Sequence, residues 1–322
     1  MKIDIISGFL GAGKTTFIQR LLKTSLSQEK IVLIENEFGE VSVDSEFLSE
    51  AKIDIKELSQ GCICCSLQGD FTKSLKEVID TYNPERIIIE PSGVGKLSDV
   101  VKAVREAELE NSLNSLVCLV DVKKVKMYSK NFGEFFIDQI ENAQTVILSR
   151  TDVAYNKVDE ALEIVRQFNQ KAIVVTTPIA ELSDIDLVKA YEGVDVELLN
   201  LEEVTKHHHE HHHDEECCCG HHHDHEHHHH ADEVFVSLGI ETVKKYNIDN
   251  LTIMLDDMSQ GKYGLVIRAK GIIAGEDGNW YQFNLTPDEV EVKKSNPSHI
   301  GMICVIGSQI NKDNIKHLFL EV

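Results

Sequence analysis

GFLGAGKTT at residues 8–16 is the stretch that decides the fold class of this chain. It fits the pattern G-x-x-x-x-G-K-[ST] through Gly8, Gly13, Lys14 and Thr15. An apolar run precedes it and an amphipathic run follows it, which is the strand, turn and helix context in which the pattern binds phosphate. The glycines let backbone N–H groups close around phosphate oxygens, and the helix N-terminus adds positive potential. We therefore predict a P-loop rather than a chance glycine-rich turn.

Short apolar runs alternate with amphipathic stretches throughout residues 1–195 and predict strands buried on both faces, with helices between them. The predicted strands are 3–7, 31–35, 86–91, 115–121, 145–149 and 172–177, and the predicted helices are 15–23, 70–82 and 157–168. This order predicts an α/β fold of the P-loop NTPase type, with a doubly wound, mostly parallel sheet. Ligands of such sheets bind at the carboxyl ends of the strands.

The rest of the chain divides into two parts. Residues 196–232 are polar and of low complexity, and they contain too little apolar surface to fold alone, which predicts a flexible linker. Residues 233–322 predict a smaller α+β domain. Its predicted strands are 233–243, 264–275, 279–287 and 300–308, and its predicted helices are 248–258 and 312–322.

Composition excludes several classes of partner. The chain has 322 residues, with 54 acidic against 32 basic side chains and a formal net charge of -22. This charge and the lack of a basic block argue against nucleic acid and anionic membranes as partners. No apolar run approaches the length of a membrane span, and the apolar N-terminus runs straight into the glycine-rich turn, which favours a strand over a signal peptide. We expect a cytoplasmic protein, in which eight Cys indicate thiolate chemistry or core positions, the latter for Cys118 and Cys304.

Three further features belong to the predicted nucleotide site. Lys14 is expected to reach the β- and γ-phosphates, and the Thr15 hydroxyl to bind the Mg²⁺ that accompanies GTP. Glu90 ends a strand in RIIIEPSGVG, where its carboxylate can hold Mg²⁺ or its water shell. Gly93 follows, where a backbone amide can contact the γ-phosphate and move after hydrolysis. The alternative for this segment is an ordinary strand end with a turn.

SRTD at residues 149–152 follows a predicted strand at the place where GTPases often carry Asn-Lys-x-Asp. Asp152 is placed to accept two hydrogen bonds from guanine. Arg150 can stack on the base through its stem and planar head, whereas Ser149 lacks the amide that Asn would supply. The motif therefore predicts a weakened preference for guanine, and a plain surface loop is the alternative.

GCICC at residues 61–65 predicts a metal site. Cys62, Cys64 and Cys65 supply three thiolates and leave one position of a tetrahedral ion open, which suits exchange of the metal. Buried cysteines or a redox pair are the alternatives. Glu37, in IENEFGEVSVD at residues 34–44, is placed to contact Mg²⁺ or to sense the metal at the cysteines, unless this segment is simply an acidic solvated turn.

A histidine-rich run occupies residues 207–230, where 14 of 24 residues are His. It begins with His207, His208 and His209 and contains Cys217, Cys218 and Cys219. Imidazoles suit Zn²⁺, Ni²⁺, Co²⁺ and Cu²⁺, and thiolates add Zn²⁺ and Cu⁺. The run is internal and broken by acids, unlike a purification tag. We interpret it as a metal store that feeds the cysteines, with a solvated spacer as the alternative.

The combination of GFLGAGKTT, ENEFGEV, GCICC, EPSG and a terminal RAKG domain resembles the CobW-type GTPase family of nucleotide-dependent metallochaperones. The resemblance covers nearly the whole chain. It implies that the three cysteines of GCICC hold the metal. It also implies that residues Gly8 to Thr16, including Gly11, Ala12 and Thr16, together with Glu37, Glu90 and Asp152, bind the nucleotide. The chain departs from the family at SRTD and at Pro91, where Thr is more usual.

We therefore expect a GTPase that carries a transition metal, zinc first, to a client metalloprotein. Cobalt or nickel delivery to a cofactor pathway such as cobalamin is an alternative, because the same ligands bind all three metals. A passive metal buffer with a structural nucleotide site is a third reading. A small-molecule P-loop kinase is a fourth, but it leaves the cysteines unexplained. Slow intrinsic turnover is expected, because no arginine finger is evident.

Overall fold

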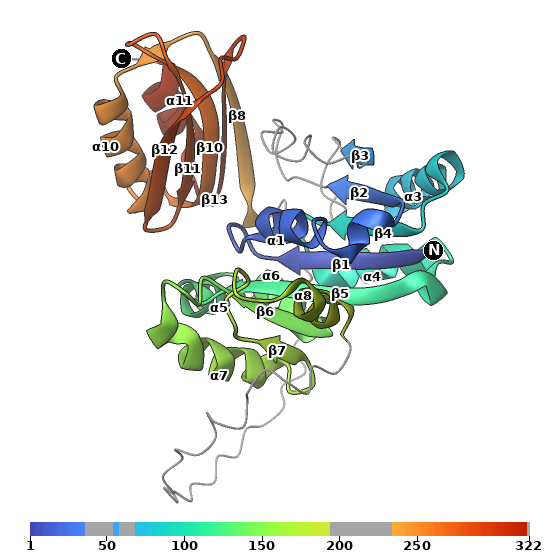
Figure 1. The fold of residues 1–322 in the computed structure, drawn as a ribbon. Coiled ribbons are helices and arrows are strands. Elements are labelled where there is room, and N and C mark those ends of the chain that lie inside the picture. Colours follow the sequence, from blue (N-terminus) through green and yellow to red (C-terminus); the bar gives the residue numbers. More distant parts are fainter. Residues whose placement is uncertain (36–53, 58–67, 194–233, 321–322) are drawn as a thin grey trace, which may run out of the picture.

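The computed structural model describes residues 1–35, 54–57, 68–193 and 234–320. Two sheets organise these residues, one in each half of the chain. Figure 1 shows the second sheet standing beside the part of the first domain that carries α1. The first sheet lies between helices on both of its faces, whereas helices pack on only one face of the second.

The first sheet has seven strands in the order β3-β2-β4-β1-β5-β6-β7, and every pairing is parallel. The strands are β1 Lys2–Gly8, β2 Ile31–Glu35, β3 Asp54–Glu57, β4 Arg86–Glu90, β5 Leu113–Asp121, β6 Thr145–Ser149 and β7 Ile173–Val175. This arrangement confirms the predicted doubly wound parallel sheet. Because the order turns back on itself around β1, the crevice where such sheets bind ligands lies at the loop after β1.

Helices cover both faces of this sheet because the strand residues alternate between two apolar cores. Ile3 and Ile5 face one core and Ile6 faces the other. The helices are α1 Lys14–Leu21, α3 Gln68–Tyr82, α4 Leu97–Glu106, α5 Val125–Asn131, α6 Gly133–Glu141, α7 Val158–Phe168 and α8 Asp184–Glu192, with 3-10 turns η1 Ser25–Gln28, η2 Glu110–Ser112 and η3 Tyr155–Lys157. Helices α1 and α8 pack on one face, and α3 to α7 pack on the other.

The second sheet has six strands in the order β12-β11-β10-β13-β8, with β9 paired to β10, and all pairings except that of β9 are antiparallel. Its elements are β8 Val236–Thr242, β9 Lys245–Tyr246, α10 Ile248–Ser259, β10 Leu265–Gly275, β11 Trp280–Thr286, β12 Glu289–Ser295, β13 Gly301–Ser308 and α11 Lys312–Leu320. Helices α10 and α11 bury Leu255 and Phe319 against one face of the sheet. This confirms the smaller α+β domain.

The opposite face of the second sheet meets the first domain. Cys304 and Ile306 of β13 belong to the same apolar core as β1 and α6. Phe235, just before β8, lies with its ring centroid 5.1 Å from that of Phe135 and 5.4 Å from that of Phe132. Shared burial of this kind holds the second sheet in a fixed place beside the P-loop.

Cys118 and Cys304 are the free cysteines of the described chain, and both are buried, as predicted for core positions. Burial raises the pKa of the Cys118 thiol to about 12. Cys118 is therefore not a reactive thiolate at neutral pH. In the same parts of the chain, no helix is long and apolar enough to cross a membrane.

Candidate nucleotide site between the two domains

The P-loop has the strand, turn and helix that its sequence predicts. Strand β1 ends at Gly8, α1 begins at Lys14, and Gly8, Gly11 and Gly13 have φ values of 143°, 75° and 94°. Residues that carry a side chain rarely adopt such φ values, so glycine avoids backbone strain here. A Cβ on Gly8 would also lie 2.6 Å from the carbonyl oxygen of Leu119. The loop therefore depends on its glycines both for conformation and for space.

The two motif side chains that follow lie where phosphate and metal chemistry requires them. The Lys14 side chain is buried, and its Nζ donates a hydrogen bond to the Gly8 carbonyl oxygen at 2.9 Å. The Thr15 hydroxyl donates to Oε1 of Glu90 at 3.3 Å. This pair joins two oxygen ligands of the hard type that Mg²⁺ prefers, so these residues fit that ion. Sequence reasoning named all three side chains, and the structure brings them together.

The segment after Glu90 packs directly on the P-loop. A Cβ on Gly93 would lie 2.7 Å from Cδ2 and 2.9 Å from the backbone N of Leu10, so only glycine fits at this distance. The buried Gln139 side chain donates to the carbonyl oxygens of Gly93 and Gly95 at 3.2 and 2.7 Å. Gly93 therefore lies directly beside the P-loop, and its contact with the γ-phosphate stays a prediction.

Arg150 of the SRTD motif is ion-paired within the protein. It adopts a positive φ of 62°, and its Nε lies 3.1 Å from Oδ2 of Asp121. Its Nη1 donates to both carboxylate oxygens of Glu289 in the second domain, at 2.7 and 2.6 Å. The guanidinium is therefore held by two carboxylates, a contact that the sequence did not predict, and its stacking on the base stays a prediction. Asp152 is exposed, and its contact with guanine stays a prediction.

Glu289 is the centre of the contact between the domains. Besides Arg150, it accepts a hydrogen bond from Nζ of Lys123 at 2.5 Å. Burial alone would raise the pKa of Glu289, but the hydrogen bond from Lys123 and the charge of Arg150 lower it below the ordinary value. Close by, Lys124 donates to the Thr286 hydroxyl, and a Cβ on Gly11 would lie 3.0 Å from Cγ2 of Thr286. The P-loop itself thus touches the second domain.

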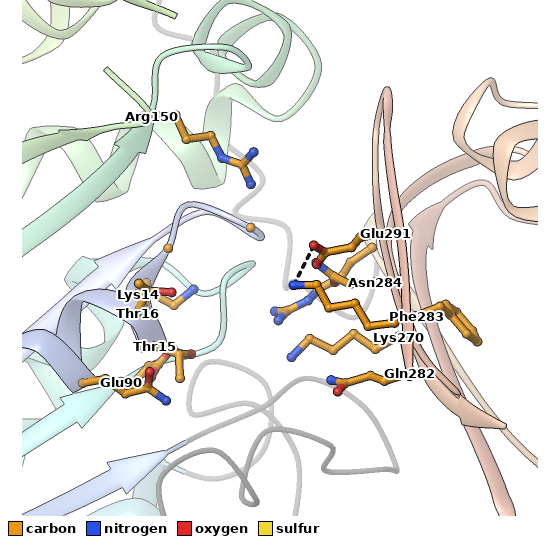
Figure 2. Close-up of a pocket in the computed structure, with 15 residues that line it drawn as sticks. Lys14, Thr15, Thr16, Glu90, Arg150, Lys270, Gln282, Phe283, Asn284 and Glu291 are labelled. Atoms are coloured by element: carbon orange, nitrogen blue, oxygen red, sulfur yellow. Dashed lines mark hydrogen bonds and ion pairs between the residues drawn. The ribbon is translucent and has the colours of Figure 1, made fainter. Parts of the chain in front are cut away.

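A pocket of about 340 Å³ lies between the P-loop and the second sheet. Figure 2 shows Lys14, Thr15 and Glu90 on one side and Lys270 and Gln282 on the other. The pocket is lined by the P-loop, by Glu90 and Arg150, and by polar side chains of the second sheet: Gly11, Gly13, Lys14, Thr15, Thr16, Gln19, Glu90, Arg150, Arg268, Lys270, Gln282, Phe283, Asn284, Glu291 and Lys293.

Sequence reasoning missed the wall that the second domain contributes. Its signal is the alternation of polar residues in strands, with Arg268 and Lys270 in β10 and Gln282 and Asn284 in β11. In a strand such residues share one face, so two neighbouring strands make one polar surface. The strands were predicted, but nothing local indicates which ligand site their polar face adjoins.

Apart from Thr15 and Glu90, which were predicted for Mg²⁺, the predicted metal ligands lie outside the described residues. These are Glu37 and the groups Cys62, Cys64 and Cys65, His207, His208 and His209, and Cys217, Cys218 and Cys219. Within 1–35, 54–57, 68–193 and 234–320, no cluster of three His, Cys, Asp or Glu could hold a metal ion. The predictions for the cysteine and histidine metal sites and for Glu37 therefore rest on the sequence.

Curated relatives and solved structures resemble the chain. The zinc chaperone YjiA of Escherichia coli is 31% identical over 58% of the chain and 59% of its own length. The zinc chaperone CobW of Sinorhizobium is 30% identical over 61% of the chain and 64% of its own length. A crystal structure of the Zn(II)-bound YjiA GTPase from E. coli covers 99% of the chain and 98% of its own length, with 22% identity and a TM-score of 0.44.

The chain covers less than two thirds of the length of these curated relatives. A family model, that of the CobW/HypB/UreG nucleotide-binding domain, matches residues 2–176. The match includes the P-loop, Glu90 and SRTD, and it spans more than half of the 322 residues. The chain therefore belongs to the CobW/HypB/UreG family.

Proposed function

We propose that this protein is a cytoplasmic GTPase that binds zinc and transfers it to a client metalloprotein. The observation that carries the nucleotide half is the Thr15 hydroxyl on the Glu90 carboxylate, 3.3 Å apart at the start of the P-loop helix. That pair joins a hydroxyl of the nucleotide motif to an acidic strand end, as a magnesium nucleotide requires. The zinc chaperone names of the relatives support the metal half.

The reaction is hydrolysis of the γ-phosphoryl group. Water attacks the γ-phosphorus, the bond to the β–γ bridging oxygen breaks, and GDP and phosphate leave. Lys14 exchanges its hydrogen bond with Gly8 for phosphate oxygens, and the P-loop N–H groups orient the triphosphate. Mg²⁺, when it is bound by Thr15 and Glu90, offsets negative charge on the phosphates. The protein's part is mainly positioning and charge stabilisation.

The metal half of the proposal rests on cysteines and histidines. Three thiolates at Cys62, Cys64 and Cys65 form a more ordered site than a tract of imidazoles, so they are assigned the tight ion. The run at 207–230 is assigned several weaker ions. Nucleotide tightens only the cysteine site, because that motif lies in the nucleotide-binding half of the chain and next to the expected switch segments, including Glu37.

The experiment is a measurement of Zn²⁺, Co²⁺ and Ni²⁺ affinity, with and without a non-hydrolysable GTP analogue. It compares the wild type with a Cys64→Ser, Cys65→Ser double variant and with a deletion of 207–230. The double variant should lose one tight ion and keep the weak ones, and the deletion should do the reverse. The analogue should tighten only the tight ion.

The proposal fails for the metal if the deletion removes the tight ion or if the analogue leaves all affinities unchanged. Metal-stimulated hydrolysis separates a chaperone from a passive buffer, because a structural nucleotide site gives no such stimulation. Tighter binding of Co²⁺ or Ni²⁺ than of Zn²⁺ at the cysteine site would move the assignment to those metals.

A further inference from the structure

The pocket has two walls of different construction. One wall is formed by the P-loop and the start of α1, where Nζ of Lys14 donates to the Gly8 carbonyl oxygen. On the other side, side chains from β10, β11 and β12 point out of an antiparallel sheet. The first wall belongs to the nucleotide motif. The residues of the second wall take no part in the hydrolysis steps assigned to Lys14, Thr15 and Glu90.

Strand register places polar and charged side chains of three strands on the face of the second sheet that lines the pocket. Lys270 pairs with Asn284, and Asn284 pairs with Glu291, so these three form one row across β10, β11 and β12. Arg268 lies two residues from Lys270 and therefore on the same face. Ala269, between them, is buried in the core under α10. Figure 2 shows the Lys270 side chain extending from the sheet toward Thr15 and Glu90.

The charge of this pocket is opposite to that of the chain. The chain carries a net charge of -22, yet five of the residues that line the pocket are basic and two are acidic. The basic ones are Lys14, Arg150, Arg268, Lys270 and Lys293, and the acidic ones are Glu90 and Glu291. Arg150 is ion-paired with Asp121 and Glu289, and Lys293 with Glu291, so we consider only the other three basic residues as phosphate ligands. Lys270 is only 9% exposed. Cations held together in a partly dry site attract a polyanion, and a triphosphate beside the P-loop supplies that charge.

The contacts between the domains keep the two walls facing each other. Gly11 of the P-loop packs on Thr286 at the end of β11, and Glu289 at the start of β12 holds Arg150. Both contacts come from the end of β11 and the start of β12, and β11 pairs with β10, the strand that carries Lys270 and Arg268. A group on β10 therefore has a fixed position relative to the P-loop, as stabilisation of a reacting phosphate requires.

We propose that Lys270 and Arg268 bind the terminal phosphates of the nucleotide held by the P-loop, so that the second domain supplies in cis the positive charge for hydrolysis. This rests on the proposed function only in placing a nucleoside triphosphate at the P-loop. As the bond to the bridging oxygen breaks, negative charge grows on the β-phosphate oxygens, and the two cations oppose it. The positive charge available for hydrolysis then depends on docking of the second domain beside the P-loop.

The test uses the full chain with Lys270→Gln and Arg268→Gln, each compared with the wild type. Lys294→Gln is the matched control, because Lys294 is an exposed residue of β12 that does not line the pocket. GTP hydrolysis gives kcat and KM, and equilibrium binding gives the affinities for a non-hydrolysable GTP analogue and for GDP. We expect each pocket variant to lower kcat by about 100-fold, as loss of a charge-stabilising donor does.

The binding arm separates phosphate contact from a general loss of structure. The analogue should bind about tenfold more weakly to each pocket variant, with a smaller change for GDP. Arg268→Lys keeps the charge and should recover most of the kcat that Arg268→Gln loses. Thermal unfolding confirms that the variants fold. If one glutamine variant does not fold, the other variant and the lysine rescue carry the test.

The outcomes distinguish this proposal from the function on which it rests. If both pocket variants behave as Lys294→Gln does, the second-domain cations are not phosphate ligands, while hydrolysis by the wild type would leave the GTPase assignment intact. If the wild type hydrolyses no GTP, the GTPase assignment fails. The difference between triphosphate and diphosphate affinities then still decides whether Lys270 and Arg268 bind the terminal phosphates.

Discussion

Two arginine clusters lie at opposite ends of the parallel sheet. At the amino end, Arg86 is fully buried, with Nη1 2.7 Å from Asp4, Nε 2.7 Å from Glu29 and Nη2 2.9 Å from Glu192. At the carboxyl end, Arg150 contacts Asp121 and Glu289, and a third of its side chain is exposed. Both arginines meet two or more carboxylates, but only the second cluster joins two domains and borders a pocket.

The difference indicates that the role of an ion-pair cluster depends on the end of the sheet at which it lies. Burial alone would lower the pKa of Arg86, but the hydrogen bond with Glu29 and the charge of Asp4 raise it above its ordinary value. That cluster joins β1, β4 and α8, and Arg86 and Asp4 are fully buried in it. At the carboxyl end, helix starts and loops leave a crevice, so the same chemistry links the domains beside a ligand site.

The largest effect is expected at the carboxyl end, from Lys14→Ala. We expect its Nζ to be the point charge at the phosphates, and its hydrogen bond with Gly8 shows that it is held in the loop. Hydrolysis should fall by at least about 100-fold, with most nucleotide binding lost, because a preorganised charge in a dry site is removed. Steady-state hydrolysis and nucleotide titration measure this. Turnover at the wild-type rate would remove the P-loop assignment.

Arg86→Ala should have the next largest effect, and on stability alone. It leaves the Asp4 carboxylate buried without its ion-pair partner, which costs about 3–5 kcal/mol of unfolding free energy. Denaturant unfolding monitored by circular dichroism measures the loss. Nucleotide affinity of the folded fraction should not change, because the cluster lies at the other end of the strands. A loss below about 1 kcal/mol, or a change in nucleotide affinity, would break the comparison.

Glu289→Gln should reduce hydrolysis without unfolding the protein. The amide loses the charge that holds Arg150 and Lys123, while Phe235 and β13 keep the second domain in contact. Because the cluster is partly exposed, we expect the activation free energy of hydrolysis to rise by about 1 kcal/mol, which corresponds to about a fivefold lower rate. Glu241→Gln, an exposed change on β8, is the control. Equal rates in the two variants would mean that Glu289 does not support the site.

The pH dependence of this link follows from the pKa of Glu289, which lies below its ordinary value. The contribution of the Glu289 charge to the contact between the domains is fully present above the unfolded pKa of about 4.3. It is lost as pH falls through the lower folded pKa. The ratio of wild-type to Glu289→Gln hydrolysis should therefore stay constant between about pH 5 and 8. A ratio that falls between pH 7 and 6 would contradict the lowered pKa.

The sequence predicted the strands that contain apolar runs, but it missed a strand without such a run and also a helix whose pattern is clear. The predicted strands are all present in the two sheets, because continuous apolar runs identify strands buried on both faces. Strand β12 was missed because EVEVKKS alternates charged and apolar residues and contains no apolar run. Helix α4 was also missed, although LSDVVKAVRE has apolar residues at helical spacing.

The candidate site divides in the same way. Lys14, Thr15 and Glu90 could be named because a local motif or strand end marks each one. Arg150 could be named, but its partner could not, because Glu289 lies 139 residues further along the chain. No local pattern encodes which face of one domain docks on another. The predicted cysteine and histidine ligands are local in sequence, and their geometry stays a prediction.

The smallest effect is expected for Asp152→Asn, which tests a residue of the carboxyl end that lies outside the Arg150 cluster. Asp152 is exposed, beyond the cluster that holds its neighbour Arg150, so a change there should leave docking and stability as they are. If its carboxylate accepts two hydrogen bonds from guanine, an amide turns one acceptor into a donor. GTP should then bind about tenfold more weakly, and xanthosine triphosphate, with a carbonyl at purine position 2, should bind more tightly. Competition between GTP, xanthosine triphosphate and ATP in the wild type and the variant measures both. Equal competition of GTP and ATP in the wild type would show that SRTD does not read guanine, and the loop would then serve only to hold Arg150 against the second domain.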